Sequence, residues 1–132
     1  MRRRFFLLAA LSAAPSLARA SGGGGEKKTT GGTNYLPIRA LTGTINKPGG
    51  RRGVMSVECG LEVNDAGLRD KAEKNMPRLR AAYLQTVLTY AGGLPYGALP
   101  NTDFLVRTMQ RQTDEMLGRQ GARILLGSVL IN

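Results

Sequence analysis

The sequence contains no histidine and no tryptophan, and its 132 residues include a single cysteine. Without histidine the chain cannot supply a Ser-His-Asp triad, a Cys-His dyad or a histidine-based zinc site. One cysteine cannot form an internal disulfide, a Cys-x-x-Cys redox pair or a cysteine-rich metal site. No segment reaches the roughly 20 apolar residues of a membrane-spanning helix, which excludes a membrane-embedded channel. We therefore expect a protein that is not an enzyme and uses neither a metal nor another cofactor.

The N-terminus has the composition of an export signal. Three consecutive arginines at 2–4 precede an apolar run over 5–18, and the small-residue sequence Ala-Arg-Ala ends the segment. A basic start, a short apolar core and a small-residue exit are typical of a secretory signal peptide. We predict that residues 1–20 are a signal peptide cleaved between Ala20 and Ser21, and that the mature protein is periplasmic.

Two alternatives remain for this segment. The sequence Arg-Arg-Phe-Phe-Leu at 3–7 resembles the twin-arginine export pattern, although ordinary signal peptides also begin with arginines. The apolar run has 14 residues and contains Pro15, so it is short for a span and its helix is interrupted. An uncleaved anchor in the inner membrane, with the rest of the chain facing the periplasm, is the alternative to cleavage.

Acidic residues are few. Lys and Arg total 19 against 9 Asp and Glu, and cleavage after Ala20 would leave 15 basic residues and a net charge of +6. A basic exported protein is attracted to anionic lipid, anionic polymers or acidic protein surfaces. Nucleic acid is not an expected partner outside the cytoplasm.

The rest of the chain divides into a linker and a domain. Residues 21–34 read SGGGGEKKTTGGTN, without a large apolar side chain. Such a segment cannot offset its ordering entropy, and we predict a flexible linker. Residues 35–132 are enough for one modest core, and we expect a single α+β domain there.

The first part of this domain has the pattern of an antiparallel hairpin. Residues 35–45 favour an extended strand, and Pro37 suits an edge strand or a strand start. In residues 54–63 apolar and polar side chains alternate, which predicts a strand with one buried and one wet face. The sequence Pro-Gly-Gly at 48–50 is the turn signal between them.

Two helices and a third strand are expected next. An Asn-Asp cap at 64–65 begins an apolar stripe with helical spacing that continues to Tyr90, and Pro77 predicts a break near Asn75. A second helix should run from Asn101 or Thr102 to Gly118. Its predicted inner face is Leu105, Met109, Gln112 and Met116, joined by Phe104 and Leu117.

The closing segment 122–131, ARILLGSVLI, is almost continuously apolar. This composition suits a strand at the sheet centre or one covered on both faces. The predicted architecture is a small antiparallel or mixed sheet of about three strands, in ββααβ order, with two or three helices packed on it.

The candidate contact residues are basic and form two groups, one on the predicted turn and one on the outer surface of the first helix. They are Lys47, Arg51 and Arg52 on the turn, and Arg69, Arg78 and Arg80 on the helix. Both groups are candidates for contact with an anionic ligand, an anionic polymer or a membrane surface. The alternative is an ordinary solvated surface.

Catalytic candidates are weak. Cys59 falls on the predicted inward face, where an inert buried thiol is expected because no histidine can activate it. Glu58 and Glu62 fall on the wet face about 13 Å apart, wider than the roughly 6.5–9.5 Å of paired glycosidase carboxylates. An enzyme of unrecognised type that uses these carboxylates or Asp65 is the remaining catalytic hypothesis.

Several of these features occur together in one family. They are the hairpin with its acidic strand face, the sequence MPRLRAA at 76–82, the amphipathic helix at 104–117 and the closing strand with its end GSVLIN at 127–132. Over residues 35–132 the chain resembles the periplasmic domain of the flagellar basal-body protein FliL. Two features differ, because the N-terminus here has a cleavable pattern and the closing strand is aliphatic rather than aromatic-rich.

The resemblance implies a non-enzymatic scaffold or adaptor that assembles around the flagellar stator and supports motility. It also implies a stomatin-like fold whose copies associate side by side. The implied partners are therefore the flagellar stator or basal body, or another protein of the cell envelope, together with further copies of the chain. A periplasmic binder of an anionic ligand or surface is the alternative hypothesis.

The fate of the N-terminus can be tested by fractionating cells that express tagged full-length protein and measuring its intact mass. We expect a soluble periplasmic species that begins at Ser21. A membrane-bound species that retains Met1 would contradict cleavage and identify the apolar run as an anchor.

Overall fold

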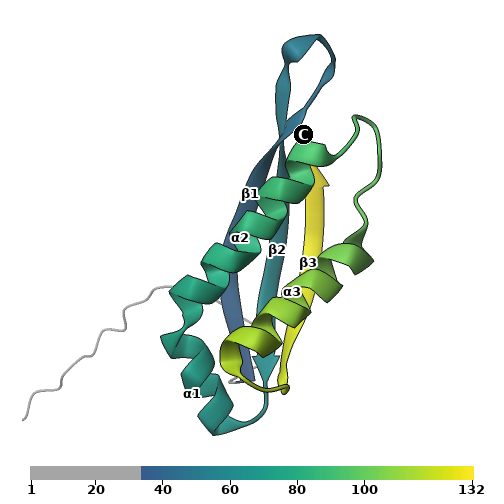
Figure 1. The fold of residues 1–132 in the computed structure, drawn as a ribbon. Helices are drawn as coiled ribbons and strands as arrows, with labels where there is room; N and C mark the ends of the chain where they lie inside the picture. Colours follow the sequence, from purple (N-terminus) through teal and green to yellow (C-terminus); the bar gives the residue numbers. More distant parts are fainter. Residues whose placement is uncertain (1–33) are drawn as a thin grey trace, which may run out of the picture.

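The computed structural model describes residues 34–132, so the predicted signal peptide, its cleavage point and nearly all of the predicted linker lie outside the described residues. A layer of strands packs against a layer of helices (Figure 1). The elements are β1 (Tyr35–Asn46), the 3-10 turn η2 (Pro48–Gly50), β2 (Arg52–Val63), α1 (Ala66–Lys74), α2 (Met76–Gly93), α3 (Thr102–Leu117) and β3 (Ala122–Ile131). The predicted α+β class is confirmed.

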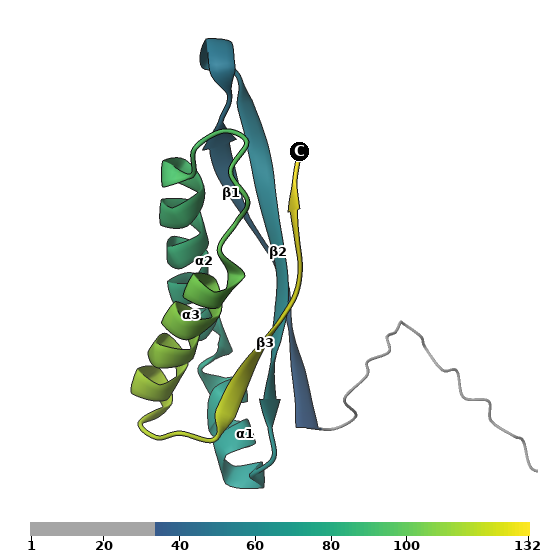
Figure 2. The same ribbon diagram turned by 90° about the vertical axis from the view of Figure 1, so that its right-hand side faces the viewer.

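The sheet is antiparallel throughout, and its spatial order is β1-β2-β3. Figure 2 shows that the helices of residues 34–132 all lie on one face of the sheet. α2 packs over β1 and α3 packs over β3. Gly43 allows the close approach of α2, because a Cβ atom there would lie only 3.0 Å from the Cβ of Ala91. The central strand β2 therefore lies beneath the seam between the two helices.

The alternation predicted for the second strand is confirmed. Every second side chain of β2 faces the helices and is buried, namely Met55, Val57, Cys59, Leu61 and Val63. The intervening side chains face the open side of the sheet, where Glu58 is exposed and Glu62 is half-buried. Burial of one face of this strand supplies the centre of the hydrophobic core.

Both edge strands are irregular at one level of the sheet. On β1 the pair Arg39 and Ala40 stands opposite Glu58, and on β3 the pair Gly127 and Ser128 stands opposite the same residue. Each pair adds one residue to its strand, which is the geometry of a β-bulge and bends the strand locally. The Ser128 hydroxyl donates a hydrogen bond to Glu58 Oε1 at 2.9 Å. This bond connects the bulge on β3 to the central strand β2.

The predicted break in the first helix is confirmed at Asn75, which separates α1 from α2. The Asp65 carboxylate caps α1 by accepting a hydrogen bond of 2.8 Å from the backbone N–H of Leu68. Pro77 falls in the first turn of α2, where its missing N–H has no helical partner to lose. The proline therefore starts a new helix rather than kinking a continuous one.

The inner face predicted for the second amphipathic helix is wrong in part. The buried residues of α3 recur every four residues, namely Leu105, Met109, Thr113 and Leu117. Gln112 and Met116 are only half-buried, and Phe104 is exposed. The apolar pattern favoured Gln112 and Met116 over Thr113, but a threonine can occupy the core where its hydroxyl has a partner.

The placement predicted for the closing strand is also wrong. β3 has the predicted bounds but lies at the edge of the sheet rather than at its centre, and only Ala122 and Ile124 are buried. The start of β3 packs under α3, whereas its end extends past the first turn of that helix (Figure 2). Ile131 is on the helical face but lies past α3, and Leu130 is on the open face, so both are exposed despite their apolar side chains.

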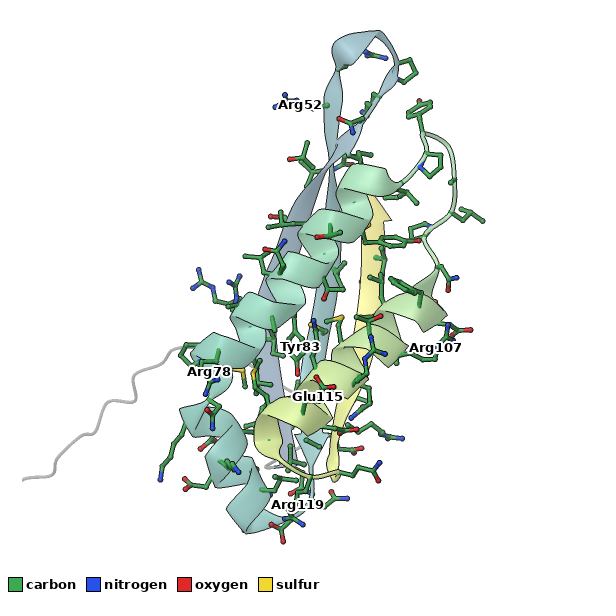
Figure 3. The ribbon with its side chains drawn as sticks, in the orientation of Figure 1. Arg52, Arg78, Tyr83, Arg107, Glu115 and Arg119 are labelled. Carbon is green, nitrogen blue, oxygen red and sulfur yellow. The ribbon has the colours of Figure 1, made fainter. Side chains whose placement is uncertain are left out.

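A buried hydrogen bond connects the two long helices. The hydroxyls of Tyr83 on α2 and Thr113 on α3 are hydrogen-bonded to each other, and both side chains are fully buried. The Thr113 hydroxyl also donates to the Met109 carbonyl at 2.8 Å. Figure 3 shows Tyr83 directed between α2 and α3. Burial raises the pKa of Tyr83 to about 12, so the phenol stays neutral at the pH of any cell compartment.

Within residues 34–132 the structure contains no helix that is both long enough and apolar enough to cross a bilayer.

The Tyr83–Thr113 contact gives a stability test by double-mutant cycle. Thr113→Val should lower the free energy of unfolding by about 1–3 kcal/mol, because the Tyr83 hydroxyl is then buried without its partner. Tyr83→Phe combined with Thr113→Val should recover part of this loss, since no polar group remains unpaired. Urea unfolding followed by circular dichroism measures both values, and Thr89→Val on the exposed side of α2 is the control. Strictly additive losses would contradict the coupling.

Candidate functional site

The two groups of predicted basic residues lie apart from each other in the structure. Figure 3 shows Arg52 on the hairpin and Arg78 near the start of α2, well away from the hairpin, while Arg119 lies at the far end. Lys47 and Arg51 flank η2 beside Arg52, whereas Arg69 and Arg80 belong to α1 and α2. The structure therefore does not combine the two groups into one anion-binding surface.

The hairpin turn holds its basic residues on a short, defined backbone. Gly49 and Gly50 both have positive φ, 77° and 76°, which glycine adopts without strain. The turn is closed by a 2.8 Å hydrogen bond from the Lys47 N–H to the Arg51 carbonyl. At the base of the hairpin, the Asn132 N–H donates to the Val54 carbonyl at 3.0 Å. The turn thus extends beyond the third strand as a two-stranded ribbon.

The hairpin tip is one part of a larger surface, which we call the hairpin end. The hairpin end consists of Lys47, Arg51 and Arg52 together with the exposed apolar residues Val54, Tyr96, Leu99, Leu130 and Ile131. Between the hairpin and the loop after α2 is a hollow of about 410 Å³. Lys47, Tyr96, Leu99 and Ile131 all line this hollow, which shows that basic and apolar side chains meet there.

The hairpin end is free of acidic side chains. Its residues belong to the segments 40–57, 86–102 and 124–132, and none of these segments contains Asp or Glu. In the described part of the chain the ion pairs are Asp70–Lys74 at 3.1 Å, Asp65–Arg119 at 2.8 Å and Glu62–Arg123 at 2.8 Å. All three lie around α1 and the adjoining ends of β2 and β3. The described ion pairs therefore lie at one end of the molecule, whereas the charged side chains of the hairpin end are all basic.

Two of the predicted helix residues stabilise the fold instead of facing solvent. Arg69 Nη1 donates to the Val63 carbonyl at 2.9 Å and to Asn34 Oδ1 at 3.1 Å, so it ties the start of β1 to the end of β2. Arg80 Nη2 donates to the carbonyl of Ala40 in the β1 bulge at 3.2 Å. Arg78, in contrast, is exposed.

Each of the catalytic candidates is either buried or engaged in a hydrogen bond or an ion pair within the fold. Burial raises the pKa of the Cys59 thiol to about 11, so little of it is the reactive thiolate near neutral pH. Glu58 accepts the hydrogen bond from Ser128, and Glu62 pairs with Arg123. Asp65 caps α1, and the Leu68 N–H lowers the pKa of its carboxyl.

A second hollow of about 530 Å³ lies between α2 and α3 on the outer side of the helical layer. Tyr90 and Phe104 line it with their rings stacked at a centroid distance of 5.7 Å. The Tyr90 hydroxyl accepts a hydrogen bond from the Asn101 N–H. These contacts connect the end of α2 to the start of α3 and account for the aromatic pair.

Among residues 34–132, no group of three His, Cys, Asp or Glu side chains is placed to hold a metal ion. No protein-family model matches the chain, and a search of curated proteins also finds no match.

Sequence reasoning identified the three basic residues of the hairpin end but missed its apolar part. Two signals were available. The loop at 94–100, LPYGALP, carries Tyr96 and Leu99 without polar side chains beside them, and the closing strand remains apolar to Ile131. The expectation of a central position for that strand concealed the exposure of its final residues.

The free energy of unfolding can distinguish an arginine that stabilises the fold from one that is only exposed to solvent. Arg69→Ala should lower the free energy of unfolding by about 1 kcal/mol, because it removes hydrogen bonds from a charged donor that is partly open to solvent. Arg78→Ala is the matched control and should change stability by less than about 0.5 kcal/mol. Chemical denaturation measures both. Equal effects would show that Arg69 does not brace the strand ends.

Proposed function

We propose that the chain is a non-enzymatic, exported scaffold or adaptor domain that resembles FliL. Its proposed place is the flagellar basal body beside the stator, or another assembly of the bacterial envelope. The observation that carries the proposal is the topology. An antiparallel hairpin leads into a helix that begins Met-Pro, a second helix follows, and a closing strand pairs with β2 up to the end of the chain.

The one-sided sheet supports a role in assembly. β1 and β3 are edge strands, and an edge strand presents unpaired backbone N–H and carbonyl groups that another chain can bind. Because both strands are antiparallel to β2, they run in the same direction. Copies placed side by side in one orientation would bring β3 of one copy next to β1 of another. Self-association of this kind is part of the proposal.

The surroundings of the reactive side chains support a role without catalysis. Cys59 is buried beneath the helices, while Glu58, Glu62 and Asp65 are engaged in separate structural contacts. A general acid–base pair needs groups that converge on one substrate position. Export is supported by the sequence pattern of residues 1–20, which lie outside the described part of the chain.

Deletion of the gene in its own bacterium tests the proposed role. We expect flagella to assemble in normal number by electron microscopy, whereas swimming in soft agar should be reduced, because a stator scaffold supports torque rather than filament growth. Wild-type protein supplied in trans should restore swimming.

The variant Glu58→Gln provides a matched control and should restore swimming equally, since the proposal assigns no chemistry to this carboxylate. Normal swimming of the deletion strain would reject the flagellar role. Failure of Glu58→Gln at wild-type protein levels would favour the enzyme hypothesis.

A further inference from the structure

The exposed large apolar side chains of this domain are concentrated at one end. Among the described residues seven such side chains are exposed, and five of them belong to the hairpin end. The two most exposed of these side chains are Leu99, at 89%, and Tyr96, at 62%. Both lie on the loop between α2 and α3, which projects beside the hairpin (Figure 1).

We propose that the hairpin end docks onto the surface of an anionic phospholipid bilayer. Lys47, Arg51 and Arg52 contact headgroup phosphates, and Leu99 and Tyr96 insert at the boundary between headgroups and acyl chains. This docking goes beyond the scaffold role and does not depend on it.

The electrostatic part follows from the charge distribution. Three basic side chains without an Asp or Glu in the neighbouring segments create a local positive potential, which attracts anionic lipid within a Debye length. Lysine and arginine have long side chains that keep the charge among headgroups while their methylene groups contact apolar surface. At the opposite end of the molecule, three ion pairs place acidic side chains directly beside basic ones.

The apolar part explains why the attraction leads to docking. Basic residues alone give weak, reversible adsorption, and stable interfacial binding combines charge with inserted apolar side chains. A leucine on a projecting loop can enter the interface without unfolding the domain. Tyrosine suits the same depth, because its ring is apolar and its hydroxyl reaches water. The hollow shared by Lys47, Tyr96 and Leu99 places one of the three basic side chains beside the two side chains that insert.

A lipid surface fits the hairpin end better than a second copy of the chain. Among the described carboxylates, Glu62, Asp65 and Asp70 are held in ion pairs. The others are distributed over β2, α1 and α3 rather than gathered on one element, and they are Glu58, Glu73, Asp103, Asp114 and Glu115. The apolar residues also lie on both faces of the sheet. Ile131 pairs with Met55 on the helical face, whereas Leu130 pairs with Ser56 on the open face. A fluid interface can contact both, whereas a flat partner contacts one.

The test places a reporter on the loop itself. The full-length chain carries Cys59→Ala, to remove the native thiol, and Leu99→Cys labelled with the polarity-sensitive fluorophore NBD. The probe membranes are vesicles of phosphatidylcholine alone and of equimolar phosphatidylglycerol and phosphatidylcholine. With the mixed vesicles at low salt we expect a blue shift and a several-fold rise in emission. Because the reporter is local, membrane attachment through another segment would not produce this signal.

Three controls decide the outcome. The signal should be lost on adding Arg51→Glu and Arg52→Glu, should decrease at high salt, and should be absent when the label is at Glu73→Cys on α1. Circular dichroism confirms that each variant is folded. An unchanged Leu99→Cys signal with mixed vesicles would overturn the proposal, as would an equal response to phosphatidylcholine alone. A shift that depends on protein concentration without vesicles would identify a protein interface instead.

Discussion

The structure depends on the burial of one face of β2 beneath the seam of α2 and α3. Five alternating side chains of this strand supply the centre of the core, and the flanking strands are positioned by their pairing with it. Each helix then covers one edge strand. The hydrogen bond between Tyr83 and Thr113 joins the helices directly above the core. Because this hydrogen bond is directional, it fixes the position of α2 relative to α3, whereas apolar packing alone would permit small shifts between the helices.

The unequal lengths of the two layers divide the molecule into two chemical environments. Where helices and sheet overlap, apolar side chains are covered and arginines such as Arg69 and Arg80 are used as braces. Beyond α3 the end of β3 continues, so Ile131 on the helical face is exposed. Val54 and Leu130 are exposed because they lie on the open face of the sheet. Apolar side chains of the strands therefore form a core where the helices cover them and an exposed surface where they do not.

Local sequence signals predicted most of the elements and failed where tertiary position decided the outcome. The alternation in β2, the break at Pro77 and the Pro-Gly-Gly turn are determined within a few residues, and each was predictable. The edge position of β3 was not, because an apolar run is equally compatible with a covered strand and with an exposed end. Thr113 was missed because its partner, Tyr83, is thirty residues away. The basic part of the hairpin end was visible in the sequence, whereas its apolar part depends on which side chains of the sheet and of the α2–α3 loop the helices leave uncovered.

The twelve-residue strand β1 has a mechanical consequence. It begins at the end of the molecule that holds α1 and finishes at the hairpin, so it covers about 40 Å at the usual rise per residue. A strand is already close to the greatest extension that its covalent geometry allows. If the chain is held before Tyr35 and the hairpin end is held elsewhere, tension passes along the backbone of β1 with almost no slack. The domain would then transmit tension as a stiff element, and the packing of its core would carry little of the force.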